Sequence, residues 1–435
     1  MDFEVLESML FIRWILFLVF LIPCSVRAGG FEPNNLFSAR YIGMGGAAAS
    51  SVEGAQSISF NPAGLAATPE WDLDMNAAGG LTHRNVPIVP DAPNSTSTTF
   101  APLLASFGSH QLSKGLGVGA GLFIAGGVGA EFGNQNYGSN YPALQPDVGG
   151  TIALIEFGVG AGYEILDGLR IGATWRPTYV GISSNSAALV NLNNTQTLLA
   201  LQYNSLHTIA WDGFRFGIQY GHKDQPWGVG ATLRTALDFN ANGNLTGTAE
   251  QSGGASQIAV SGGNVTASSK FPLLMGIGFH YDINPEFRLV TQYEFLWGNQ
   301  VQSFAVSGDP VTLQGVTTLP ASALSIPLDW KNESRIRVGA EYRPNESRVW
   351  RIGYVYASAM TPANEANAVF TAPGPEHNLD LGMGWMNTTV LGHRADVDLA
   401  FDFSINPGTA ENSIPGSLNG TYTLTSYALH VGVRY

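Results

Sequence analysis

The amino-acid sequence predicts an all-β fold, a transmembrane antiparallel β-barrel of about 14 strands. Many segments of about ten residues alternate between apolar and polar or small side chains, as expected for strands with one face in lipid and one in a lumen. The chain has 53 glycines and only 12% charged residues, against about 25% in ordinary soluble domains. Beyond residue 28 no apolar run reaches the roughly 18 residues that a membrane helix needs.

The N-terminus has the pattern of a secretion signal. A basic residue precedes the apolar run 14–22, and the Val-Arg-Ala sequence at 26–28 has the small residues of a cleavage site. We therefore expect residues 1–28 to be a signal peptide that is cleaved near Ala28. Several acidic residues precede Met9, which is unusual for such a signal and predicts that the true start is Met9.

Composition and motif content exclude several function classes. The net charge of −13 argues against a nucleic-acid partner. The only cysteine, Cys24, lies in the signal, so neither disulfides nor thiol chemistry are expected in the mature chain. The eight histidines lack metal-ligand spacing, and the motifs of hydrolases, zinc proteases and nucleotide-binding loops are absent. We expect no enzyme, no cofactor and no metal.

The C-terminal segment shows the strand pattern most clearly. Every second residue from Tyr427 to Tyr435 is apolar, and the residues between them are Ala, His, Gly and Arg. A barrel strand that ends on an aromatic residue resembles the signal read by the bacterial barrel assembly machinery. The alternation predicts strands at 71–82, 99–110, 114–125, 152–165, 168–180, 207–220, 226–240, 270–283, 286–298, 332–344, 347–358, 376–387, 393–405 and 425–435.

The predicted connections alternate in length, as they do in outer-membrane barrels. Short ones lie between the strand pairs at one end, and long polar ones fall near 83–98, 126–151, 181–206, 241–269, 299–331, 359–375 and 406–424. The main rival fold is a soluble β-sandwich or β-solenoid. The many glycines on the polar faces, and the Trp, Tyr and Phe at strand ends, favour the barrel. Apolar residues in 126–151 and 181–206 form either a capture groove for a ligand or ordinary loop packing.

Residues 38–66 are rich in Ala, Gly and Ser and end in an Asn-Pro turn. This stretch resembles the N-terminal hatch of the long-chain fatty acid outer-membrane transporters (FadL-type, OMPP1/FadL/TodX superfamily). The resemblance is carried by the Gly-Met-Gly-Gly-Ala run at 43–47 and by the turn segment Phe60, Asn61, Pro62, Ala63, Gly64 and Leu65. It implies a hatch over residues 29–70 inside a barrel over residues 71–435, with the turn segment as its gate.

Three further segments are similar to pieces of the same family in the same order. They are the Asp-Trp-Lys sequence at 329–331, the Arg-x-Gly-Tyr sequence at 351–354 and the Pro-Glu-His sequence at 375–377. The last lacks the arginine often found there. Within the family a kink in the third strand opens the wall sideways, and the third predicted strand carries Gly115, Gly117, Gly119 and Gly121 on one face. These glycines either form that kink or make room for the hatch.

The inward faces of the later strands hold paired charges. Five of these residues are candidates for a ligand site or for an ionic network that ties the hatch to the wall: Arg335, Arg337, Arg351, Asp396 and Asp398. The resemblance implies passive uptake of long-chain fatty acids or other hydrophobic molecules across the outer membrane of a Gram-negative bacterium. The expected barrel is a monomer in contact with outer-membrane lipid. The alternatives are a porin-like channel for small polar solutes, a lipid-modifying enzyme, and an adhesive or structural barrel.

Overall fold

The computed structural model describes residues 38–221, 224–370, 372–411 and 418–435. The predicted signal peptide, with its cleavage site and the proposed start at Met9, lies outside these residues, as does the beginning of the predicted hatch. Within the described part of the chain, no helix is long and apolar enough to cross a bilayer.

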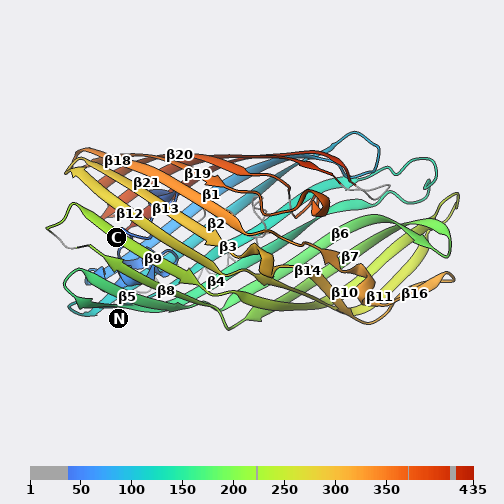
Figure 1. The fold of residues 1–435 in the computed structure, drawn as a ribbon, viewed down its shortest axis with the longest axis horizontal. Coiled ribbons are helices and arrows are strands. Elements are labelled where there is room, and N and C mark those ends of the chain that lie inside the picture. Colours follow the sequence, from blue (N-terminus) through green and yellow to red (C-terminus); the bar gives the residue numbers. More distant parts are fainter. Residues whose placement is uncertain (1–37, 222–223, 371, 412–417) are drawn as a thin grey trace.

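The expected barrel of about 14 strands is confirmed (Figure 1). All wall pairings are antiparallel, and the first and last strands pair with each other, which closes the sheet. Ten wall positions are single strands: β1 (Trp71–Val86), β2 (Ser95–Ser113), β3 (Leu116–Asn134), β4 (Asp147–Leu166), β13 (Phe287–Leu296), β18 (Glu333–Asn345), β19 (Arg348–Ala357), β20 (Glu376–Val390), β21 (His393–Ala410) and β22 (Gly420–Arg434).

The other four wall positions are interrupted strands. Each has one piece toward the left end of Figure 1 and one toward the right. The pairs are β5 (Leu169–Trp175) with β6 (Thr178–Leu192), β8 (Phe214–Tyr220) with β7 (Thr195–Ala210), β9 (Trp227–Arg234) with β10 (Leu237–Gln251), and β12 (Leu274–Asn284) with β11 (Ile258–Phe271). We call the half that contains β5, β8, β9 and β12 the lower barrel, and the half that contains β6, β7, β10 and β11 the upper barrel.

The side-chain pattern reverses between the two halves in some of these strands. In β9, Val229 faces outward and Gly230 is buried, whereas in β10 Leu237 and Phe239 are buried and Asp238 is exposed. Side chains of a strand alternate between its two faces. Residues at the interruption that are not paired with a neighbouring strand can therefore turn the face that points outward in one half into the face that points inward in the other. The lower barrel therefore has an apolar outer face, which suits lipid, and the upper barrel has an apolar interior.

This reversal corrects the prediction of long loops at 181–206 and 241–269. Most of these residues are strand, in β6, β7, β10 and β11. A search for apolar residues that face lipid misses them, because their outward residues are Asn, Ser and Thr. The apolar residues in question pack inside the upper barrel, where the largest core cluster includes Leu199, Leu201, Leu237 and Phe239.

The excursion between β13 and β18 adds small elements around the upper barrel. β14 pairs with β11, and β17 pairs with β14. The elements of this excursion are η3 (Gly298–Gln300), β14 (Ser303–Gly308), β15 (Val311–Leu313), β16 (Thr317–Leu319), η4 (Ala321–Leu324) and β17 (Ile326–Pro327). A further short helix, η5 (Ala363–Glu365), lies between β19 and β20.

Candidate functional site

Residues 38–70, which we call the N-terminal segment, contact the inward faces of strands around the barrel. The segment contains α2 (Ala39–Ile42), η1 (Ala55–Ile58) and η2 (Pro62–Ala67), drawn in blue toward the left end of Figure 1. Ser38 caps α2 by accepting a hydrogen bond from the Tyr41 amide. Most of the segment is buried.

Asn61 links this segment to the wall. It caps η2, as the Asn-Pro pair predicts, and its Oδ1 accepts a hydrogen bond from the Ala63 amide at 3.2 Å. Its Nδ2 donates to the carbonyl oxygen of Ala49 at 2.7 Å, and to the strand carbonyls of Ile218 at 3.1 Å and Ala231 at 3.3 Å. The side chain is fully buried. One amide group therefore stabilises the turn, the segment and two wall strands together.

The other predicted gate residues lie beside Asn61. Pro62, Ala63, Gly64 and Leu65 are buried in η2, and Phe60 packs its ring 5.3 Å from that of Tyr41. The structure thus brings all six residues of the turn into one contact region.

Glycines of the wall make room for this region. A Cβ placed on Gly217 of β8 would lie 1.7 Å from Asn61 Oδ1, and one on Gly172 of β5 would lie 2.2 Å from the Pro62 carbonyl oxygen. On β9, a Cβ on Gly230 would lie 2.1 Å from the Ala49 carbonyl oxygen. The lower lumen is therefore shaped for backbone contact with the N-terminal segment.

The predicted charged residues fall into two networks and one separate position. In the first network, Arg337 Nη1 donates to the Gly45 carbonyl oxygen at 2.8 Å, and Arg337 Nη2 pairs with Glu294 at 3.0 Å. Arg335 pairs with Glu333, and its Nη1 lies 3.9 Å from Glu294. This network therefore joins β13 and β18 to the N-terminal segment.

The second network consists of wall residues. Arg351 Nε pairs with Glu341 at 2.7 Å, and its Nη1 pairs with Asp398 at 2.5 Å. Asp396 lies apart from both networks and accepts a hydrogen bond from the Asn387 amide at 3.0 Å. The five predicted residues thus do not form one site.

Sequence reasoning missed a third network, formed by residues of β4 and β8 and by Arg176, which directly follows β5. Arg215 Nη1 donates to the Ile58 carbonyl oxygen at 2.7 Å and pairs with Glu156 at 3.0 Å. Arg176 pairs with the same carboxylate at 2.8 Å. Glu156 and Arg215 occupy inward positions of the alternation, which was the available signal. Among the described residues, no group of three His, Cys, Asp or Glu side chains is placed to hold a metal ion.

The third strand has its irregularity above the predicted glycines. Gly115 lies in the turn before β3, and Gly117, Gly119 and Gly121 lie in a regularly paired stretch with β4. A Cβ on Gly117 would lie 2.0 Å from the Leu65 carbonyl oxygen, so this glycine makes room for the N-terminal segment. The register with β4 first shifts between Ile124 and Gly126, above these glycines, and shifts again between Glu131 and Gly133.

The ladder between β2 and β3 ends close to that shift. The strands pair from Ser113 with Leu116 as far as Ala105 with Phe123, and their upper parts, although described, are not paired with each other. Small apolar side chains fill the space: Ala101, Leu103 and Ile124 form a buried cluster. The wall is therefore held there by side-chain packing in place of backbone hydrogen bonds.

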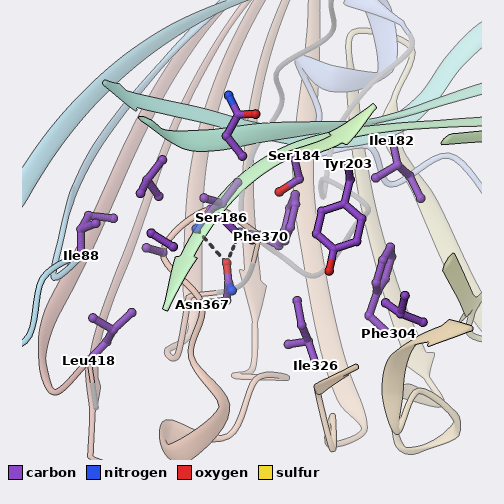
Figure 2. A pocket seen from close by; sticks show the side chains of 16 residues that line it. Ile88, Ile182, Ser184, Ser186, Tyr203, Phe304, Ile326, Asn367, Phe370 and Leu418 are labelled. Atoms are coloured by element: carbon purple, nitrogen blue, oxygen red, sulfur yellow. Dashed lines mark hydrogen bonds between the residues drawn. The ribbon is translucent and has the colours of Figure 1, made fainter. Parts of the chain in front are cut away.

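The upper barrel contains an apolar cavity of about 90 Å³ (Figure 2). Its lining includes Ile88, which lies just after β1, Ile182 of β6, Tyr203 of β7 and Phe304 of β14. The loop 366–370 also lines the cavity. In this loop the Asn367 side chain accepts hydrogen bonds from the amides of residues 369 and 370 at 2.9 and 3.0 Å. The few polar groups include Ser184 and Ser186.

Several apolar residues of 126–151 and 181–206, which the sequence predicts in exposed loops, are buried. Tyr141 and Leu144 are buried with Leu198 in one cluster, and the Tyr141 hydroxyl donates to Gln196 at 3.0 Å. Burial also raises the pKa of Tyr137, in the same loop, to about 12, so its phenol stays neutral at physiological pH. These residues pack against each other in the closed structure and do not form an open groove.

Comparisons with known proteins agree with this architecture. The structure is similar to that of a Pseudomonas aeruginosa FadL homologue, with a TM-score of 0.74 and 13% identity over 94% of this chain and 99% of that one. It is also similar to the Pseudomonas putida toluene transporter TodX (TM-score 0.71, 16% identity, 93% and 99% covered) and to the Ralstonia pickettii toluene transporter TbuX (0.67, 17%, 92% and 98%). No curated protein sequence matches the chain.

The family assignment rests on the sequence. A family model described as outer membrane protein transport protein (OMPP1/FadL/TodX) matches residues 19–435, nearly the whole chain. The members of this family are transport channels of the outer membrane and not enzymes. The chain therefore belongs to the OMPP1/FadL/TodX family of integral outer-membrane transport proteins.

Proposed function

We propose that this protein carries hydrophobic small molecules, long-chain fatty acids among them, passively across the outer membrane. The observation that carries the proposal is the reversed pattern of the upper barrel, which lines its interior with apolar residues around a cavity. A porin for polar solutes needs a polar lumen. An interior lined mainly by apolar side chains suits a ligand that has left water for an apolar pocket.

In this proposal the N-terminal segment is a hatch. A ligand first occupies the apolar cavity of the upper barrel, and the turn around Asn61 then shifts to open a path through the lower lumen. The hydrogen bonds of Asn61 to β8 and β9, and that of Arg337 to Gly45, would hold the hatch closed. No cofactor or energy source is needed, because the ligand follows its concentration gradient.

The place where β2 and β3 are unpaired supports a sideways exit into the membrane. The buried cluster of Ala101, Leu103 and Ile124 fills the wall close to the point where the pairing of β2 with β3 ends. Deleting Ala125, which lies at the register shift of β3, should restore continuous pairing with β4. We expect the deletion to lower hydrophobic uptake while the barrel still assembles; undiminished uptake from a folded deletion variant would refute the sideways route.

Two substrate classes fit the cavity differently. The similar solved structures include one described as a monoaromatic hydrocarbon channel and two described as toluene transporters. A compact aromatic ligand matches a cavity of about 90 Å³ better than a long alkyl chain does. For a fatty acid, the loop 366–370 would have to move aside. We propose that fatty acids are also substrates, and that they enter the cavity at the position of this loop.

The test is uptake by cells that lack their own transporter of this kind. Labelled oleate, toluene and a small polar dye are supplied to cells with this protein, with a variant carrying Asn61→Ala and Pro62→Ala, or with an empty vector. Uptake of either hydrophobic compound by the parent, without dye entry, supports the proposal. Dye entry alone would favour the porin alternative, and no uptake from an inserted barrel would contradict transport of either compound.

The remaining expectations on partners are part of the same proposal. The outward apolar face of the lower barrel suits contact with outer-membrane lipid. The aromatic residue Tyr435 directly follows β22, and we propose the barrel assembly machinery as a partner on that basis. We propose that the barrel is a monomer, since each barrel encloses its own cavity and N-terminal segment.

A further inference from the structure

Arg84 is an inward-facing arginine of β1 in the upper barrel that has no counter-charge in the part of the chain that the structure describes. Its side chain is 1% exposed, and none of its three nitrogens has a hydrogen-bond partner among the described residues. Burying a guanidinium without a partner is far less favourable than burying a paired one. The position therefore needs an explanation that the N-terminal segment and the ionic networks do not supply.

Two neighbouring strands place unused hydroxyl groups on the same inward face. Arg84 is paired in register with Ser97 of β2 and Leu424 of β22. Thr99 lies two residues from Ser97 on β2, and Tyr422 lies two residues from Leu424 on β22. Both side chains are buried, and their hydroxyl groups also lack hydrogen-bond partners among the described residues. Diagonal neighbours on a sheet face are about 7–8 Å apart, within reach of long side chains. Five N–H groups and two hydroxyls can thus act as donors in one patch.

Within the described ranges of the chain, no acidic side chain pairs with Arg84. The amide of Glu131 donates to Ser97 Oγ at 3.1 Å, but its carboxylate lies toward β4, where a Cβ on Gly149 would be 2.5 Å from Glu131 Oε2. By contrast, the inward-facing Arg337 and Arg351 each pair with a glutamate or aspartate. A patch of donors that carries a positive charge and holds no carboxylate among the described residues suits an anion with two oxygens.

The patch adjoins the apolar interior of the upper barrel. Val86, two residues above Arg84, packs in a cluster with Ile88, Tyr422, Leu424 and Val369. Ile88 and Val369 also line the cavity in Figure 2. At about 3.3 Å per extended residue, the stretch from Arg84 to Ile88, which lies just after β1, spans at most roughly 13 Å. A molecule in the cavity could therefore reach the patch with an end group if its apolar part stayed above.

We propose that Arg84, with Tyr422 and Thr99, forms a binding site for the carboxylate group of a ligand whose apolar tail occupies the cavity above. The inference rests on the proposed function and adds a residue that selects acidic over neutral ligands. The loop 366–370 contributes Ala368 and Val369 to the cluster over the patch. It folds on the side chain of Asn367, so its displacement exposes the patch without breaking the barrel wall.

The test compares ligands that share a tail and differ in the head group. Binding of decanoate, 1-decanol and acetate is measured by calorimetry on the purified full-length barrel, for the parent and for Arg84→Met, Arg84→Lys and Tyr422→Phe. Arg394→Met, which removes a positive charge from an exposed position, is the matched control. Heat-dependent migration on a gel checks that each barrel is folded.

Arg84→Met should bind decanoate roughly 10-fold to 100-fold more weakly, with decanol within about twofold of the parent. Arg84→Lys should recover part of the loss, and Arg394→Met should change nothing. Unchanged decanoate binding in a folded Arg84→Met barrel, or an equal loss for decanol, would overturn the inference. Acetate binding as tight as decanoate would overturn the tail assignment. A parent that binds decanol but not decanoate refutes this site alone. A parent that binds neither also refutes this site, and the proposed function fails with it only if toluene uptake is absent as well.

Discussion

Asn61 offers the sharpest test of how the N-terminal segment is held, because its two polar atoms do different things. Oδ1 caps η2, and Nδ2 donates to three carbonyl oxygens, of which two belong to wall strands. Loss of a cap costs about 1 kcal/mol, and loss of a buried hydrogen bond costs about 1 kcal/mol more. Asn61→Ala should therefore destabilise the seated segment by about 2 kcal/mol, a roughly 30-fold shift toward the displaced state.

Asn61→Asp separates the two roles. An aspartate keeps the oxygen that caps η2, and a carboxylate is favourable at a helix N-terminus. It also places an oxygen where the amide now donates to carbonyls 2.7 to 3.3 Å away. Facing acceptors with an acceptor in a buried site costs more than removing the donor. We therefore expect Asp to displace the segment more than Ala does.

Thiol labelling measures the displaced population. The sequence has a cysteine only at position 24. Ser57 is fully buried, and its hydroxyl lacks a hydrogen-bond partner among the described residues. Ser57→Cys therefore introduces a thiol that is protected from the label while the segment is seated. Labelling should accelerate about 30-fold with Asn61→Ala and further with Asn61→Asp. The matched changes at Asn345, an exposed residue that accepts from the Ser347 amide, should leave the rate unchanged. Labelling of the Asp variant at the parental rate would show that only the cap matters, and refute the link to the wall.

Three other predictions concern the glycines, the ionic networks and the cavity. Gly217→Ala should accelerate the same labelling, because its Cβ would lie 1.7 Å from Asn61 Oδ1; Gly108→Ala, with nothing within 4 Å, is the control, and equal rates would contradict the fit. Arg337→Met and Arg351→Met should each lower barrel stability by about 3–5 kcal/mol in denaturant unfolding, because each removes the nearest positive charge from a buried carboxylate, Glu294 or Asp398. Only Arg337→Met should also loosen the segment, since Arg337 alone of the two bonds to it; equal labelling in both would argue against that contact. Ile182→Trp should fill the cavity and reduce hydrophobic uptake severalfold without changing labelling, and normal uptake in a folded variant would place the ligand elsewhere.

The sequence predicts the lower barrel well because one physical signal covers it. Strands that face lipid need apolar outward residues, so their apolar–polar alternation identifies them in the sequence. The segments beginning near Trp71, Phe287 and Trp350 are strands where predicted. The upper barrel stands in another environment. Its outward residues are polar, and its apolar residues alternate in the opposite phase, as in Phe239 beside Asp238. Nothing in a lipid-facing pattern predicts strands there.

The candidate site was predictable only in part, for a different reason. Alternation tells which side chains point inward, and the Asn-Pro turn tells where the segment is capped. It does not tell which inward side chains meet across the lumen. Arg337 and Arg351 are equivalent by pattern, yet only Arg337 bonds to the N-terminal segment. Glu156 is joined by two arginines from strands that are far apart in sequence.

The partners of the inward arginines distinguish a structural role from a ligand role. In the lower barrel an arginine is held by a carboxylate, as Arg337 is by Glu294 and Arg351 by Asp398, so its charge is already balanced and is costly to recruit for a ligand. Arg84 is equally buried and faces the same interior, but among the described residues it adjoins an apolar cluster and no carboxylate. Stability alone would favour an apolar residue there, because an unpaired buried charge opposes folding. A charge that stability does not explain, next to a cavity that a hydrophobic tail would fill, is where selection among hydrophobic ligands should be made.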